Sequence, residues 1–202
     1  MSEPIPVVLF ADFVCPFSYV TEQALRKLAG EGVVRIDRRA FELFPEPVPL
    51  PAEPGPEGWR AAVLPLAGEL GLEMGDPPRP PRTRKAHELA RWVETGGGGW
   101  EVRAAIYHAH FARGKDIGRI DTLLELAGDY GLDQTEAKVI LDLDRYAASV
   151  EQDREEAGRI GVRTTPALIA GHGANARLLT GARSYRELSQ ALLETAEKEP
   201  ES

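Results

Sequence analysis

Two short apolar runs near the start of the chain, separated by one helical segment, constrain the fold more than any other feature. The first run, IPVVLFAD at 5–12, is compact and β-branched, which is typical of a buried strand. Apolar and small residues then recur at helical spacing over 17–29, and VVRIDRRAFEL at 33–43 alternates as a second strand would. This order favours a parallel pair of strands joined by a right-handed crossover.

Prolines mark where this sheet stops. They recur six times between 45 and 56 and again in DPPRPPR at 76–82, and proline cannot donate a hydrogen bond to a β-ladder. Helical patterns follow, among them those at 59–70, 85–94, 101–113 and 145–160. Strand patterns return only in TPALIAG and ARLLTG, before a last amphipathic helix in SYRELSQALLETAEK. We therefore predict an α/β fold whose sheet domain is interrupted by a large all-helical insertion.

Composition narrows the class of protein. The chain has 202 residues, 43% hydrophobic and 28% charged, which is a normal globular balance. Its net charge of -8 argues against nucleic acid and against an anionic membrane surface as partners. No basic segment precedes an apolar core at the start, and no run of 18 apolar residues occurs. A single cysteine forms no intrachain disulfide, so we predict a cytoplasmic protein without a membrane segment.

That cysteine, Cys15, falls at the junction of the first strand and the first helix. Free N–H groups at a helix start stabilise an anion, and Pro16 fits the first helical position. The position therefore predicts a nucleophilic thiolate with a lowered pKa. A buried structural cysteine is the alternative. Pro166, directly before a strand pattern, has a similar alternative as an ordinary trans proline that starts a strand.

Five segments, in order, resemble one family. DFVCPFSY, TRKAHELARW, AIYHAHFARGKDIGRIDTLLELAGDYGLD, EAGRIGVRTTPALI and LTGARSYRELSQAL together extend over nearly the whole chain. They are similar to segments of the DsbA-like thioredoxin family, in particular its FrnE-like cytoplasmic branch. That branch is related to kappa-class glutathione transferases and 2-hydroxychromene-2-carboxylate isomerases. The resemblance implies a thioredoxin fold, α/β in class, over 1–44 and 155–202, with a helical insertion at 45–154.

The resemblance also implies roles for individual residues. Cys15 would be the nucleophile, Pro166 would be cis, and Ser18 would tune or replace a resolving thiol, although it could equally cap the helix. The substrate-binding residues implied are Pro16, Phe17, Thr165, Gly181, Ala182, Arg183 and His87. Backbone N–H groups at Arg183 and Ser184 would hold a glutathione carboxylate, or would simply open a capped helix. No metal site is expected.

Three positions depart from the family pattern. Ser18 stands where a second cysteine is common, Phe17 where tryptophan is common, and Arg82 where asparagine is usual. Without a resolving cysteine, Cys15 cannot form an internal disulfide. The first hypothesis is thiol–disulfide exchange with glutathione or another small thiol as co-substrate and no tightly bound cofactor, in a monomer or homodimer. The alternatives are a glutathione-dependent transferase or isomerase, and a redox-inactive binding module.

Overall fold

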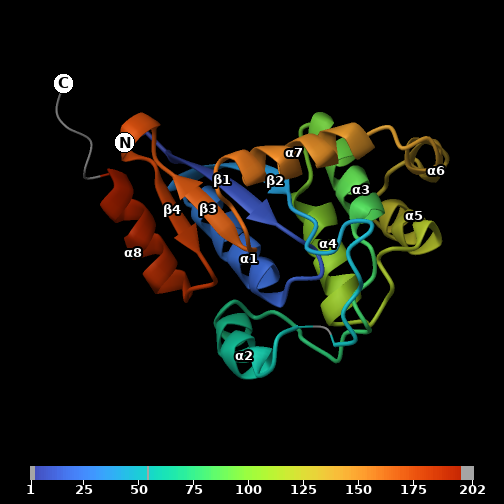
Figure 1. Cartoon of the computed structure of the whole chain (residues 1–202), viewed down its shortest axis with the longest axis horizontal. Coiled ribbons are helices and arrows are strands. Elements are labelled where there is room, and N and C mark those ends of the chain that lie inside the picture. Colours follow the sequence, from blue (N-terminus) through green and yellow to red (C-terminus); the bar gives the residue numbers. More distant parts are fainter. Residues whose placement is uncertain (1–2, 54, 197–202) are drawn as a thin grey trace.

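The computed structural model describes residues 3–53 and 55–196, and its centre is a four-stranded sheet (Figure 1). The strands are β1 (Ile5–Ala11), β2 (Val34–Ala40), β3 (Ala167–Ala170) and β4 (Arg177–Thr180), in the spatial order β2-β1-β3-β4. β1 and β2 are parallel, while β3 is antiparallel to both β1 and β4. β1 is therefore a central strand, which explains why its sequence is apolar throughout.

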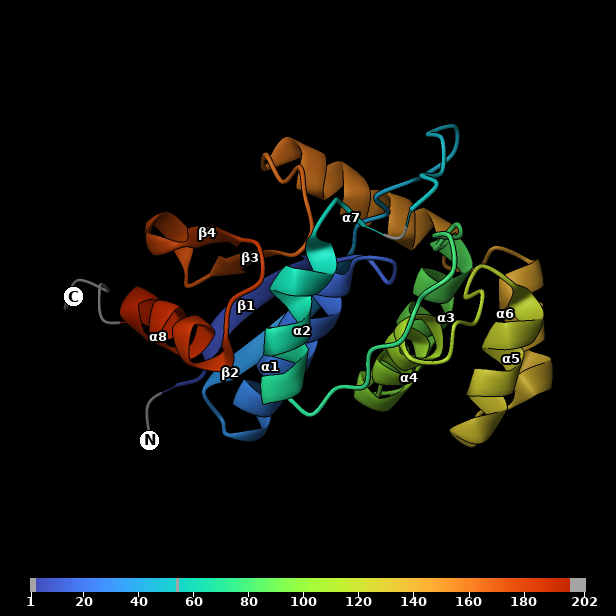
Figure 2. The same ribbon diagram turned by 90° about the horizontal axis from the view of Figure 1, so that it is seen from below.

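Helices cover both faces of the sheet (Figure 2). α1 (Pro16–Gly30) and α8 (Tyr185–Ala196) bury Leu25, Leu28 and Leu192 against alternate residues of β1. α7 (Ala147–Arg159) packs on the opposite face, where Ala157 contacts Phe10. Side chains of a strand point alternately to the two faces, so β1 supplies both cores.

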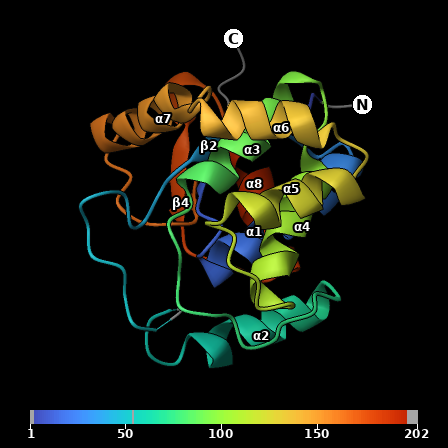
Figure 3. The ribbon, with the colours of Figure 1, turned by 90° about the vertical axis from the view of Figure 1, so that its right-hand side faces the viewer.

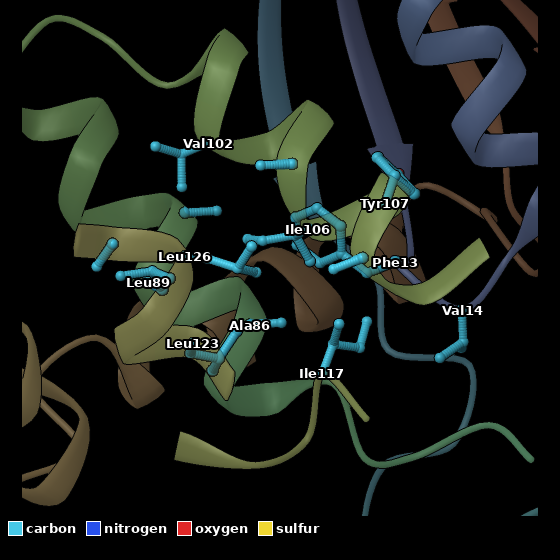
Figure 4. Packing of buried hydrophobic residues seen from close by; sticks show 14 of the residues in the cluster. Phe13, Val14, Ala86, Leu89, Val102, Ile106, Tyr107, Ile117, Leu123 and Leu126 are labelled. Atoms are coloured by element: carbon cyan, nitrogen blue, oxygen red, sulfur yellow. The ribbon is translucent and has the colours of Figure 1, made fainter. Parts of the chain in front are cut away.

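The remaining helices lie between β2 and β3 in the sequence. They are α2 (Trp59–Glu69), α3 (Arg84–Thr95), α4 (Trp100–Phe111), α5 (Ile120–Asp129) and α6 (Gln134–Asp142). α3 to α6 gather at one end of the sheet, and α2 packs against α1 (Figures 2 and 3). Their core is the largest buried cluster, which includes Phe13, Leu89, Ile106 and Leu123 (Figure 4).

The predicted order of elements is confirmed. All four strands lie where the sequence indicated, and no strand occurs between β2 and β3 in the part of the chain that the structure describes. The predicted boundary between the helical insertion and the sheet domain, at 154–155, falls within α7. α7 is one continuous helix, and its Ala157 packs against the sheet. Residues 1–2, 54 and 197–202 of the predicted domains lie outside the described residues.

A buried ion pair ties the insertion to the sheet domain. Arg103 of α4 donates to both carboxylate oxygens of Glu22 on α1, with Nη2 2.8 Å from Oε2. The Tyr107 hydroxyl donates to the same carboxylate at 3.1 Å, and the Arg103 guanidinium lies 4.8 Å from the Phe13 ring centroid. Both charges are almost fully buried. Removing one partner of such a pair leaves the other charge without compensation in the core.

We expect Arg103→Met to lower the free energy of unfolding by about 3–5 kcal/mol, because it leaves the Glu22 carboxylate buried and unpaired. The matched control is Arg26→Met, since Arg26 also bridges α1 to α4 through Glu101, but at an exposed site. That control should cost at most about 1 kcal/mol. Urea unfolding with linear extrapolation measures both values. Equal losses in the two variants would contradict the assignment.

Candidate active site

Cys15 occupies the N-cap of α1. Its backbone is extended, with φ -94° and ψ 112°, and Pro16 follows at the first helical position. The backbone N–H of Ser18 donates to the Cys15 sulfur at 3.4 Å. The Cys15 N–H donates in turn to the Asp12 carbonyl at 3.1 Å, which closes the turn between β1 and α1. The strand–helix junction expected from the sequence is therefore present. The sulfur accepts an N–H group of the first helical turn, which has no partner within the helix.

The segment before β3 faces this thiol. The Cys15 sulfur donates to the Thr165 carbonyl oxygen at 3.4 Å, and the two residues are 150 positions apart in the sequence. The peptide bond between Thr165 and Pro166 is cis. The Pro166 carbonyl accepts the Gly181 N–H at 3.0 Å, which joins this segment to the end of β4. The fold thus brings the cysteine and the proline segment together.

The pKa of Cys15 differs from the expectation. Burial raises the pKa of the thiol, because the charged form loses its hydration. The side chains of Ser18 and Thr165 and the Ser18 N–H lower it, and the Asp12 charge raises it, but burial has the largest effect. The prediction of a lowered pKa is therefore wrong for this structure, in which Cys15 is only 5% exposed. A sulfur that donates to the Thr165 carbonyl is also a protonated one.

A cavity of about 410 Å³ opens beside the Cys15 sulfur. Its volume is within the range of about 300–1,000 Å³ that is usual for small-molecule sites. Most of its wall is apolar. The lining residues are Val14, Cys15, Pro16, Phe17, Leu43, Phe44, Pro51, Glu53, Gly55, Pro56, Pro80, Thr164 and Thr165. Four residues that the sequence singled out, Cys15, Pro16, Phe17 and Thr165, thus share one cavity.

Ser18, Pro166 and His87 do not line this cavity. Ser18 is fully buried, and its hydroxyl accepts the Asp12 N–H at 3.4 Å. His87, on α3, is 2% exposed, and its Nε2 lies 3.2 Å from an Asp12 carboxylate oxygen. Pro166 lies behind Thr165, at the start of β3. In this structure His87 is thus a buried partner of Asp12, away from the space that a substrate would occupy.

The segment from Gly181 to Ser184 is occupied by contacts of its own. Arg183 donates from Nη1 to the carbonyls of Thr180 and Gly181, at 3.2 and 3.3 Å. Ala182 packs beside Phe17 near α2. The Ser184 N–H and hydroxyl both donate to the Glu187 carboxylate, at 3.0 and 2.7 Å. Because this carboxylate closes the start of α8, the capped-helix interpretation holds there.

Two parts of the site were missed by sequence reasoning. Asp12 is fully buried and touches both Ser18 and His87, and it is the only charged residue in the run from 5 to 15, which was the available signal. The second part is the cavity wall. The proline-rich segments were expected only to mark where the sheet stops, yet Pro51, Pro56 and Pro80 themselves line the cavity.

The described residues offer little for a metal or a membrane. Across 3–53 and 55–196, no three His, Cys, Asp or Glu side chains are grouped so that they could hold a metal ion. The helices in the same residues include none that is long and apolar enough to cross a bilayer.

Comparison with known proteins agrees with this geometry. The model of the DSBA-like thioredoxin domain matches residues 6–193. The uncharacterized protein YwbO of Bacillus subtilis (strain 168) is 30% identical over 148 residues, which are 70% of this chain and 74% of YwbO. Nearly three quarters of YwbO thus aligns with this chain.

Two solved structures share the fold. The probable DsbA oxidoreductase SCO1869 of Streptomyces coelicolor has a TM-score of 0.81 at 22% identity, over 98% of this chain and 92% of that one. The cytosolic disulfide reductase DsbM of Pseudomonas aeruginosa has a TM-score of 0.68 at 19% identity, over 96% and 98%, and it has also been solved with GSH. The predicted thioredoxin fold with a helical insertion is confirmed, and this chain belongs to the DsbA-like thioredoxin family.

Proposed function

We propose that this chain catalyses thiol–disulfide exchange with Cys15 as its single nucleophile. The observation that carries the proposal is the position of the Cys15 sulfur. It lies at the start of α1, 3.4 Å from the Thr165 carbonyl, and it borders a cavity of about 410 Å³. Cys15 lines that cavity, so a disulfide bound there would lie next to the thiol. Family membership as a DsbA-like protein supports the same chemistry.

The exchange has two steps. The Cys15 thiol loses its proton to solvent, attacks one sulfur of a disulfide R–S–S–R, forms a Cys15–S–S–R bond and displaces RS⁻, which takes up a proton. An external thiol R′SH then attacks the substrate sulfur of that mixed disulfide. Cys15 leaves as a thiolate, and R–S–S–R′ is released. One disulfide and one thiol are consumed and one of each is formed, so the step needs no further oxidant or reductant.

The external thiol is required because Ser18 cannot resolve the mixed disulfide. Glutathione is a suitable small thiol, and the structure of the related DsbM with GSH supports it. Ser18 tunes the nucleophile, since its hydrogen bonds to the sulfur lower the pKa that burial raises.

A reducing compartment suits this proposal. A monothiol enzyme with one cysteine forms no structural disulfide, and a reduced thiol pool supplies the external thiol. DsbM, which shares the fold, is described as cytosolic. We propose the cytoplasm as the site of action.

The first prediction concerns the pH dependence of Cys15. Because burial disfavours the thiolate, the rate of alkylation by iodoacetamide should rise with pH to a midpoint above about 8.5, the ordinary cysteine value. The same chain unfolded in urea serves as its own control and should show the ordinary midpoint. Ser18→Ala should move the folded midpoint further up. It removes the Ser18 side chain, which lowers the pKa of Cys15, and keeps the backbone N–H. A folded midpoint at or below the unfolded one would refute this view of the thiol.

The second prediction concerns Ser18→Cys, which creates a C-x-x-C pair on an intact scaffold. The backbone N–H of residue 18 already lies 3.4 Å from the Cys15 sulfur, so the new thiol would be within disulfide reach. The variant should form an internal disulfide and, in that oxidised form, transfer it to one equivalent of reduced protein substrate, becoming reduced itself. The wild type should form only a mixed disulfide with a small disulfide such as oxidised glutathione, and should need an external thiol to release it. Mass spectrometry measures the internal and mixed disulfides, and reoxidation of reduced ribonuclease measures the transfer.

Cys15→Ser provides the control in both backgrounds and should abolish exchange. If the Cys15→Ser variant turns over as fast as the wild type, the chemistry belongs to other residues. If that variant is inactive but wild-type Cys15 forms no mixed disulfide with any disulfide offered, the redox-inactive binding module replaces the enzyme. Conjugation of an electrophile to glutathione, without disulfide exchange, would instead favour the transferase class.

A further inference from the structure

The wall of the Cys15 cavity carries a distinctive charge pattern. Eight of its members are apolar, namely Val14, Pro16, Phe17, Leu43, Phe44, Pro51, Pro56 and Pro80. Glu53 is the one acidic side chain among the lining residues, and it is exposed. None of the lining residues is a lysine, arginine or histidine. The cavity therefore offers apolar surface and a single negative charge.

Two arginines that bind carbonyl oxygens of this wall, Arg79 and Arg82, are already engaged. Arg82 donates from Nη1 to the carbonyls of Val48 and Pro45, at 2.6 and 3.1 Å, and pairs through Nε with Glu46 at 3.0 Å. Arg79 donates to the Pro51 and Leu50 carbonyls, each at 2.9 Å. These guanidinium groups hold the backbone of the wall, which has few N–H groups because it is rich in proline. The guanidinium groups of Arg79 and Arg82 are thus not available to bind a ligand in the cavity.

The second place for an anion is closed as well. The start of α8 would attract a carboxylate through its free N–H groups, but Glu187 already accepts the Ser184 N–H at 3.0 Å. An anionic ligand in the cavity would therefore meet the like charge of Glu53. Glutathione has two carboxylates and one ammonium group, so its net charge at neutral pH is negative. It has no cationic partner among the residues that line the cavity.

We infer that the cavity accepts an apolar disulfide or thiol whose only charge is positive, and that Glu53 is the residue that selects this charge. The inference rests on exchange at Cys15 as proposed above, and it narrows the class of substrate that enters the cavity. Glutathione can still act as the external thiol, because the resolving thiol attacks from solvent while the substrate group occupies the cavity. The apolar wall binds the body of the substrate, and Glu53 at the rim binds its cationic end.

The test compares three disulfides that differ in charge. Cystamine is dicationic, bis(2-hydroxyethyl) disulfide is neutral, and oxidised glutathione is anionic. The rate of mixed-disulfide formation with Cys15 is measured by mass spectrometry and divided by the rate of the same disulfide with free N-acetylcysteine amide, a neutral thiol, which removes intrinsic reactivity. The wild type should prefer cystamine to oxidised glutathione by at least about fivefold. About 1 M salt should reduce this preference, because it screens charges at an exposed rim.

Glu53→Gln should lower the preference for cystamine over the neutral disulfide by about two- to fivefold, the effect of an exposed charge pair. Glu53→Lys should shift it further, toward oxidised glutathione. The matched control is Glu57→Gln, which removes the same charge from an exposed residue of the same segment that does not line the cavity. It should leave the wild-type preference unchanged, so the net charge of -8 alone does not account for the selection.

The outcomes separate the two proposals. A wild-type preference for oxidised glutathione, or equal effects of Glu53→Gln and Glu57→Gln, would overturn the charge selection and leave exchange at Cys15 intact. Failure of all three disulfides to form a mixed disulfide with Cys15 would overturn the proposed function, and this inference with it.

Discussion

The carboxylate of Asp12 is the point at which four segments of the chain meet. It is fully buried just after β1, accepts the Leu43 N–H at 2.7 Å and lies 3.2 Å from His87 Nε2. Through its backbone, Asp12 also binds Ser18 and Cys15. A buried carboxylate is costly unless such partners satisfy it. The end of the strand, the start of α1, the segment after β2 and the insertion helix α3 must therefore all be in place together, and the thiol is held where they meet.

The state of the thiol results from two opposing effects. The start of a helix and the hydrogen bonds of Ser18 favour the thiolate, whereas burial and the nearby Asp12 charge favour the thiol. Burial prevails here, in a site that is almost closed to solvent. A position at a helix start is visible in a sequence, but the depth of burial depends on segments that arrive from far along the chain. This is why the junction was predicted and the direction of the pKa shift was not.

The sequence predicted the helices and strands better than it predicted which residues, distant in sequence, contact one another. Strand and helix periodicity located β1 to β4 and the helical insertion, because these patterns depend on neighbours within a few residues. The resemblance paired Cys15 with Thr165, which the structure brings to 3.4 Å. The role of His87 as a partner of Asp12 depends instead on tertiary packing between β1 and α3. The same is true of Leu43 and Pro80 as walls of one cavity, since nothing local marks residues that are distant in sequence as neighbours.

Arg79 and Arg82 hold the backbone of the proline-rich cavity wall, so the path of this backbone is independent of the side chains that it carries. Both arginines bind main-chain carbonyls, at Val48 and at Pro51 for example, so the path of this segment does not depend on which side chains it presents. One constraint remains at Gly55, where a Cβ atom would lie 2.7 Å from the Trp59 ring. Elsewhere in the segment, substitutions can accumulate without disturbing the strands and helix that hold the cysteine. Over evolutionary time, related chains can therefore diversify what they recognise while the reacting sulfur stays where it is.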